Sequence, residues 1–174
     1  MRVISGTARG RKLQAPSGRG TRPITDRAKE GIFNMLMSHG EVADATVLDL
    51  YAGSGSFGLE CVSRGAEHVT FVEVNRDAAA TIQRNLDQFG FADRASIATI
   101  PVANAIASAT WVDLAFCDPP YADDPWAELL PLIKADLLVG HAEREIALTS
   151  EWSEIRRKKY GRAKIVLAAR IDSR

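Results

Sequence analysis

Residues 47–58 read VLDLYAGSGSFG, an apolar run that enters a glycine turn and continues into a helix-like stretch as far as Arg64. The glycines fall at G-x-G-x-x-G spacing. Gly53 and Gly55 let a ligand approach the backbone closely, and Gly58 lets the helix pack against the strand. This strand, turn and helix are typical of nucleoside-binding α/β folds, although the spacing alone is a weak motif.

A carboxylate follows at the position where such folds bind a ribose. Glu73 ends the apolar run of residues 69–72, about twenty residues beyond the glycine turn. Two ligands fit this arrangement, a nicotinamide dinucleotide and S-adenosylmethionine. Asp49 favours S-adenosylmethionine, because a carboxylate just before the turn repels a pyrophosphate but suits the ammonium group of methionine. Asp49 equally fits a buried acid that caps the turn through backbone N–H groups.

A second polar segment, Asp118-Pro119-Pro120-Tyr121, follows the apolar run of residues 112–117. Two prolines keep the chain extended, so a helix does not use up the carbonyl groups there. The Asp118 carboxylate and the Pro119 carbonyl would accept the two hydrogens of a planar amino group, and Tyr121 would stack on the base that carries it. The alternative is a turn that ends the strand, with Asp118 as a helix cap.

These segments together resemble the S-adenosylmethionine-dependent methyltransferases that modify exocyclic amino groups. Residues 22–34, RPITDRAKEGIFN, further resemble the R-P-T-T-D-R-V-R-E…F-N stretch of the bacterial 16S ribosomal RNA guanine-N2 methyltransferases, as do residues 1–13. The resemblance covers nearly the whole chain, and residues 22–34 are its most specific part. It implies a methyltransferase that acts on one guanine of 16S ribosomal RNA, on assembled or partly assembled small ribosomal subunits.

The resemblance also implies roles for individual residues. The cofactor contacts would be Asp49, Tyr51, Ala52, Gly53, Ser54, Gly55, Glu73, Val74 and Asn104. The catalytic residues would be Asp118, Pro119, Pro120 and Tyr121. The RNA contacts would be Arg11, Lys12, Arg22, Thr25, Asp26 and Arg27, of which residues 22–27 fit a loop anchor and helix cap as well. Asn104 departs from the family pattern, which usually has an aspartate there to contact adenine, and it fits an ordinary loop or cap asparagine equally.

Hydrophobic periodicity and glycine or proline breaks predict the order of the elements. We expect a hairpin at residues 2–15, a loop at 16–24 and a helix at 25–38. Further helices are predicted at 57–64, at 76–89 and from Pro125 with an interruption at Pro131. Strands are predicted at 46–50, 68–73, 95–100, 112–117, 145–149, 155–160 and 164–170. Alternating strands and helices indicate an α/β fold with a mostly parallel sheet and an antiparallel end. The resemblance implies a Rossmann-like class I methyltransferase: a seven-stranded sheet with helices on both faces and an N-terminal β-hairpin extension.

Length and charge bound the partners. A chain of 174 residues with 46% apolar content and zero net charge fits one domain, with a basic extension at residues 1–24 and a core at residues 25–174. Lysine and arginine are concentrated at both ends, in residues 1–30 and 155–174. If the two ends lie together, they form a phosphate-binding surface for RNA, whereas apart they are ordinary solvated faces.

Other functional classes find little support. Cys61 and Cys117 lie in apolar contexts that predict buried thiols, and His39, His68 and His141 lack metal-ligand spacing, so we expect them at the surface or in packing and expect no metal. No stretch reaches the length of a membrane span, and the start lacks a signal-peptide core. We therefore expect a cytoplasmic monomer.

Two other interpretations use the same residues. A DNA or RNA adenine-N6 methyltransferase shares the logic of residues 118–121, but the chain lacks a further domain to read duplex sequence. A nucleotide-binding or RNA-binding module without catalysis, or a small dehydrogenase, also fits the glycine turn. Binding of S-adenosylhomocysteine, with no binding of nicotinamide dinucleotides, would separate the methyltransferase from the dehydrogenase.

Overall fold

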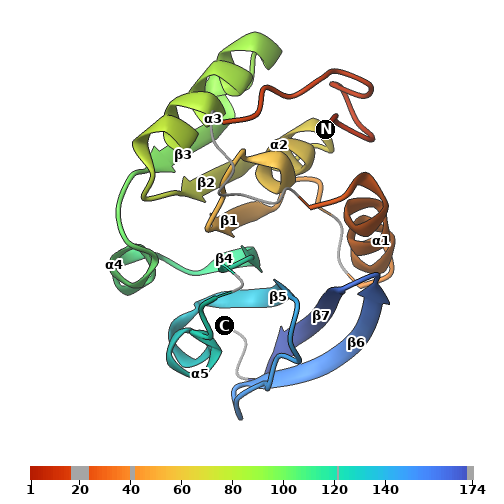
Figure 1. Ribbon diagram of the computed structural model, residues 1–174, viewed down its shortest axis with the longest axis vertical. Helices are drawn as coiled ribbons and strands as arrows, with labels where there is room; N and C mark the ends of the chain where they lie inside the picture. Colours follow the sequence, from red (N-terminus) through yellow and green to blue (C-terminus); the bar gives the residue numbers. More distant parts are fainter. Residues whose placement is uncertain (17–23, 40–41, 121, 172–174) are drawn as a thin grey trace.

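The computed structural model describes residues 1–16, 24–39, 42–120 and 122–171. Its centre is a seven-stranded sheet in the order β3-β2-β1-β4-β5-β7-β6 (Figure 1). The strands are β1 Thr46–Leu50, β2 His68–Val72, β3 Ala95–Ala98, β4 Val112–Cys117, β5 Ala135–Ala142, β6 Trp152–Tyr160 and β7 Ala163–Arg170. The neighbouring strands β3, β2, β1, β4 and β5 are parallel, and β7 runs antiparallel to β5 and β6. The predicted mostly parallel sheet with an antiparallel end is confirmed.

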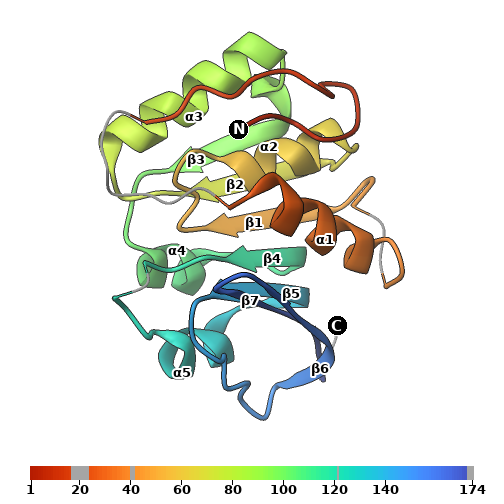
Figure 2. The ribbon, with the colours of Figure 1, turned by 45° about the vertical axis from the view of Figure 1, so that its right-hand side comes forward.

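Helices cover both faces of this sheet (Figure 2). The helices are α1 Asp26–Leu36, α2 Ser56–Ser63, α3 Arg76–Phe89, α4 Val102–Ser108 and α5 Trp126–Leu129, with 3-10 turns η1 Ala92–Arg94 and η2 Leu130–Leu132. Apolar residues of α1, α2 and α3 form one buried cluster with one side of the sheet, and those of α4 and α5 form a second cluster with the other side. This is the three-layer arrangement that parallel sheets require, because both of their faces must be buried.

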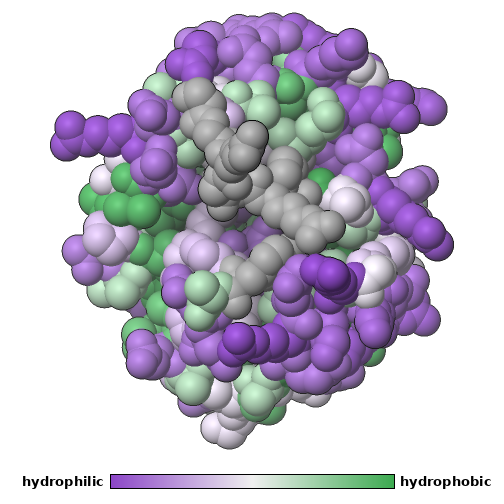
Figure 3. All heavy atoms as spheres, in the orientation of Figure 1, coloured by the Kyte–Doolittle hydropathy of each residue, from purple (hydrophilic) through white to green (hydrophobic). Residues whose placement is uncertain are grey.

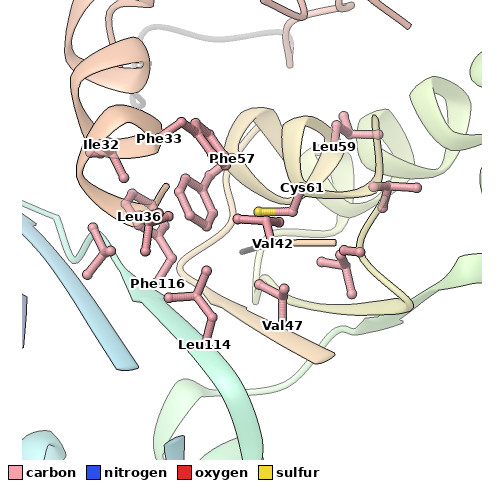
Figure 4. Close-up of a cluster of buried hydrophobic side chains, with 14 of the residues drawn as sticks. Ile32, Phe33, Leu36, Val42, Val47, Phe57, Leu59, Cys61, Leu114 and Phe116 are labelled. Carbon is pink, nitrogen blue, oxygen red and sulfur yellow. The ribbon is translucent and has the colours of Figure 1, made fainter. Parts of the chain in front are cut away.

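An aromatic stack joins α1, α2 and the centre of the sheet (Figure 4). The ring of Phe57 lies 5.2 Å from the Phe33 ring and 4.0 Å from the Phe116 ring, measured between centroids. Phe57 stands in the first turn of α2, directly after the glycine turn, so its packing fixes the turn against the sheet. Elsewhere the face seen in Figure 3 is mainly hydrophilic, with apolar groups in scattered patches.

The described part of the N-terminal extension, residues 1–16, is a chain reversal closed by one antiparallel bridge between Arg2 and Lys12. The hairpin predicted at residues 2–15 thus has this bridge but no regular strands. It is fastened to α1 and α2 by buried polar groups. Glu60 accepts hydrogen bonds from the backbone N–H groups of Ile4 and Ser5, at 2.7 and 2.9 Å. The Nζ atom of Lys29 lies 3.3 Å from Glu60 and donates to the carbonyl of Arg2 at 2.8 Å.

The predicted strand at residues 145–149 is wrong, because these residues are irregular and the fifth strand is β5 at 135–142. Residues 145–149 read EIALT, a short apolar centre between two polar residues that imitates a strand, although only Ile146 among them is buried. Residues 135–142 lack the alternation of polarity that marks a half-exposed strand, because β5 is covered on both faces. The helix expected from Pro125 is also shorter than its pattern suggests, and helix α4, which contains Asn104, has no counterpart among the predicted elements.

Candidate functional site

The carboxyl ends of β1, β2, β4 and β5 meet at one edge of the sheet. The chain leaves β1 toward β2 on one side, while β4 lies on the other side, so this is the switch point at which open α/β sheets bind ligands. The glycine turn follows β1, Glu73 follows β2 and Asp118 follows β4. The backbone N–H of Asp118 donates to the carbonyl of Leu50 at 3.4 Å, which ties the two central segments together. The structure thus brings the predicted cofactor and catalytic segments to one place.

The glycine turn has the tight backbone that its sequence predicts. Gly53 and Gly55 have φ angles of 55° and 74°, in the left-handed region that glycine adopts readily. A Cβ atom on Gly55 would lie 3.0 Å from the Cγ1 atom of Ile82. Tyr51 also has a positive φ, 58°, a strained conformation for a tyrosine and one that is concentrated at functional sites. Burial raises the pKa of Tyr51 to about 12.

Asp49 is a buried acid with an unused oxygen. Its side chain is 1% exposed, and its Oδ2 atom accepts a hydrogen bond from the N–H of Gly58 at 3.0 Å. Within the described part of the chain, its Oδ1 atom has no hydrogen-bond partner. Burial raises the pKa of Asp49 well above the usual carboxyl range, and the charges of Asp118 and Glu73 raise it further. A cationic donor placed beside Oδ1 would relieve both the missing bond and the burial cost.

Glu73 links β2 to the glycine turn. Its Oε2 atom accepts from the N–H of Gly53 and its Oε1 atom from the N–H of Asn75, both at 2.8 Å. Each carboxylate oxygen retains a further lone pair, so ribose hydroxyls have acceptors here. Val74 beside it is 64% exposed, which leaves an apolar side chain at the rim of the site. Asn104 lies in α4 with its side chain exposed.

Asp118 has a partner that the sequence analysis does not predict. Its Oδ1 atom lies 2.6 Å from the Nδ1 atom of His141, and the two side chains are 21% and 2% exposed. Pro119 is buried and Pro120 is exposed, while Tyr121 lies outside the described residues. The role expected for His141, a surface or packing residue, therefore misses its contact with Asp118. Correct placement of β5 is the signal that would have found it.

A cavity of 380 Å³ opens beside His141, which is large enough for a nucleotide. Its lining comes from the start of α1, the end of β5 and the turn between β6 and β7. The lining residues are Ile24, Thr25, Arg27, Ala28, His141, Glu143, Lys159, Tyr160, Gly161, Arg162 and Ala163. The cations Arg27, Lys159 and Arg162 outnumber the acid Glu143, so the cavity suits a polyanion. Arg27 of the N-terminal basic stretch therefore lies close to Lys159 and Arg162 of the C-terminal one.

The predicted RNA contacts separate into two groups. Thr25 and Arg27 line the cavity, and Thr25 also caps α1 by accepting from the N–H of Ala28 at 3.2 Å. Asp26 pairs with Arg2 at 3.7 Å across a largely exposed contact.

Arg11 lies elsewhere. Its guanidinium donates to the carbonyl of Gln88 and covers the ring of Phe89 at 4.4 Å, at the end of α3 opposite to Glu73. Lys12 forms the bridge with Arg2, and Arg22 lies outside the described residues.

Other reactive groups are accounted for by packing. Cys61 and Cys117 are buried, as predicted, and burial raises the pKa of both thiols well above the usual range. Among the described residues, no three His, Cys, Asp or Glu side chains gather closely enough to hold a metal ion. The helices of the same residues are too short or too polar to cross a bilayer.

Comparisons with known proteins agree with this geometry. The family model described as "Conserved hypothetical protein 95" matches residues 1–169. "Putative rRNA methyltransferase YlbH" of Bacillus subtilis is 35% identical, over 92% of this chain and 94% of its own length. "Ribosomal RNA small subunit methyltransferase D" of Escherichia coli is 33% identical, over 92% of this chain and 85% of its own. The solved structure titled "Putative methyltransferase yhhF from Escherichia coli" superposes with a TM-score of 0.87 at 33% identity, over 100% of this chain and 99% of that one.

Proposed function

Because this chain belongs to the family described as conserved hypothetical protein 95, which includes ribosomal RNA small subunit methyltransferase D, we propose that it methylates 16S ribosomal RNA. The reaction is transfer of a methyl group from S-adenosylmethionine to the exocyclic N2 amino group of a guanine. One observation carries the proposal: the Asp118 segment and the glycine turn are joined side by side at the switch point of the sheet. Donor and acceptor can therefore meet there.

The chain's own groups fit the proposed cofactor. The unpartnered Oδ1 atom of Asp49 suits the ammonium group of its methionine part. Glu73 offers acceptors to the ribose, and Val74 and Asn104 would contact the adenine. Tyr51, Ala52, Ser54 and the two turn glycines supply the backbone that encloses it. When bound, the cofactor supplies an electrophilic methyl group on a sulfonium.

The proposed chemistry is one in-line displacement. Asp118 and the carbonyl of Pro119 accept the two hydrogens of the guanine amino group, which localises the nitrogen lone pair. That pair forms the new N–C bond as the C–S bond breaks, and the nitrogen then loses a proton to Asp118 or to water. The enzyme contributes mainly orientation, so no metal is needed. Pro120 stiffens the segment, and Tyr121 would stack on the base.

The cavity between α1 and the β6–β7 turn is the proposed entrance for the nucleotide. Arg27, Lys159 and Arg162 would bind phosphates, and Thr25, Asp26 and Arg22 would shape the opening. A paired guanine hides both its faces, so the target must be unpaired or extruded from its helix. The proposal covers one methyltransferase domain over residues 1–174, with residues 1–24 as a basic extension in which Lys12 would contact the RNA.

The substrate class is tested by product analysis. Labelled S-adenosylmethionine is supplied with unmethylated small subunits, free 16S ribosomal RNA or DNA, and the labelled nucleoside is identified after digestion. We expect N2-methylguanosine from the ribosomal substrates. N6-methyladenine from RNA or DNA would instead support the adenine methyltransferase and overturn this proposal. A bacterial ribosomal RNA substrate implies that the enzyme works in the cytoplasm. The expected monomeric state is tested separately, by light scattering.

A further inference from the structure

We propose that His141 is a positioning residue for methyl transfer, which orients the carboxylate of Asp118 toward the amino group of the target base. The inference rests on the proposed function and adds a residue to its machinery. It starts from the contact of 2.6 Å between the Nδ1 atom of His141 and the Oδ1 atom of Asp118. An ionised carboxylate has no hydrogen to donate, so beside an ionised Asp118 the Nδ1 atom of His141 would be the donor.

The register of the sheet produces this contact. In the parallel pair of β4 and β5, Phe116 lies opposite Val139 and Cys117 lies opposite Gly140. One residue further along, Asp118 comes opposite His141. Side chains at matched positions of neighbouring strands stand on the same face of a sheet. The contact is therefore set by the pairing of two central strands and does not depend on a flexible loop.

His141 is held firmly enough to orient another group. Its side chain is 2% exposed, and on its other side β5 pairs with β7, where His141 lies opposite Ile165. A group that orients a reacting residue must itself be fixed by packing. Asp118 is 21% exposed, so it is open to a substrate.

The hydrogen bond gives the two oxygens of Asp118 different tasks. Oδ1 is engaged by His141, whereas no hydrogen bond within the described ranges engages Oδ2. With Oδ1 fixed, rotation of the carboxyl group is restricted and Oδ2 keeps one direction. A single acceptor of fixed direction is what alignment of an amino lone pair requires.

His141 also faces the cavity that receives the nucleotide in the proposed function. The same residue thus lines the cavity and holds Asp118. A base that enters between Arg27 and Arg162 would come close to the buried residue that sets the direction of the catalytic carboxylate. His141 thereby connects binding of the nucleotide to alignment of its amino group.

Three substitutions at one position test the inference. The side-chain amide of asparagine places an N–H near the position of Nδ1, whereas glutamine places it near the position of Nε2. His141→Ala and His141→Gln should lower kcat about 10- to 100-fold, the range for losing one hydrogen bond to a charged group. His141→Asn should recover most of this loss. KM for the RNA and the affinity for S-adenosylhomocysteine should change little in all three variants.

A purely structural role predicts different results. Equal kcat for His141→Asn and His141→Gln would overturn the inference, as would a loss of S-adenosylhomocysteine affinity in proportion to kcat. If His141→Ala fails to fold, the asparagine and glutamine variants still decide, with melting temperatures measured for both. His68→Ala is the matched control, because His68 lies at the start of β2, at the opposite edge of the sheet.

The product analysis keeps this inference separate from the proposed function. Should the wild-type enzyme produce N6-methyladenine, the guanine proposal fails, while the order of the His141 variants still tests positioning of Asp118. Should the wild-type enzyme methylate guanine N2 with equal rates in every His141 variant, only the positioning role fails. A wild-type enzyme without methyl transfer to any nucleic acid would overturn both.

Discussion

Two buried acids in neighbouring elements, Glu60 and Asp49, differ in how fully their carboxylate oxygens are hydrogen-bonded. Glu60 is fully buried in α2 and accepts from the N–H groups of Ile4 and Ser5 and from Arg64, besides its ion pair with Lys29. Asp49 is equally buried, yet it accepts one backbone hydrogen bond and leaves one oxygen unpartnered among the described residues. Buried polar groups are normally satisfied, so the exception requires an explanation.

The difference separates a fastening region from a binding region. Around Glu60 every charge has a partner, and the result is attachment of the N-terminal extension to α1 and α2. Around Asp49, Glu73 and Asp118, acids of one sign gather at the carboxyl ends of the strands. Their mutual repulsion costs stability, and ligands that donate hydrogen bonds or carry positive charge would relieve it. We therefore expect changes in the first region to alter folding and changes in the second to alter function.

Asp118→Ala should give the largest change in function. Loss of the carboxylate that aligns the amino group should lower kcat by about 10²–10³-fold, comparable to the loss of one preorganised group at a reacting centre. Calorimetry should find the affinity for S-adenosylhomocysteine nearly unchanged, because Asp118 is assigned to the substrate. If cofactor affinity and turnover fall together, Asp118 has a structural role, and the contrast between the region around Glu60 and the region around Asp118 is lost.

Glu60→Ala should give the largest change in stability. Burial lowers the pKa of Lys29, and Glu60 opposes that shift, so removal of the acid leaves a buried and unpaired amine. Breaking a buried ion pair in this way costs about 3–5 kcal/mol. Urea denaturation measures the loss, with Glu67→Ala as the exposed control from the loop that follows α2. An unchanged free energy of unfolding would show that the buried network does not fasten the extension.

The fastening region and the glycine turn differ in how well the sequence predicts them. The strand, turn and helix at residues 46–63 follow from local patterns, because glycine spacing and hydrophobic periodicity lie within one short segment. Glu60 and Lys29 carry no such pattern. They meet only because α1 and α2 pack together, which depends on contacts between segments that are distant in the chain.

The same limit explains the missed parts of the site. His141 meets Asp118 through the register of β4 and β5. The sequence hides β5 because residues 135–142 do not alternate in polarity and because the apolar centre of residues 145–149 imitates a strand. The cavity requires the β6–β7 turn to fold back to α1, another contact over a long stretch of chain. Helix α4, in contrast, could have been predicted from local sequence, because Pro101 precedes a run rich in alanine that favours a helix.

Asp49→Asn should sharpen the comparison by changing stability and function in opposite directions. The folded-state pKa of Asp49 is raised above its unfolded value. Its ionisation therefore destabilises the fold at pH values above the raised pKa, and this cost disappears below the unfolded value, where both states are protonated. Asparagine should raise the melting temperature at pH 7, by about 2–4 °C per kcal/mol relieved.

The gain from Asp49→Asn should shrink as the pH falls toward 4. The affinity for S-adenosylhomocysteine at pH 7 should fall, because the ammonium group loses its anionic partner. Melting curves at both pH values and calorimetry provide the measurements. A variant that is less stable at pH 7 would mean that Asp49 is a satisfied structural acid like Glu60.

Arg162→Ala should have the smallest effect, because it removes one exposed cation from the cavity rim without touching either acid. Loss of one phosphate contact should weaken RNA binding several-fold at low salt and reduce the slope of log K against log salt by about 1. Cofactor affinity and unfolding should stay unchanged. Filter binding of 16S ribosomal RNA over a salt series measures the slope, and Arg11→Ala is the matched control, since Arg11 is held against the far end of α3. If Arg11→Ala reduces the slope and Arg162→Ala does not, the RNA lies along the extension, and the cavity is not its entrance.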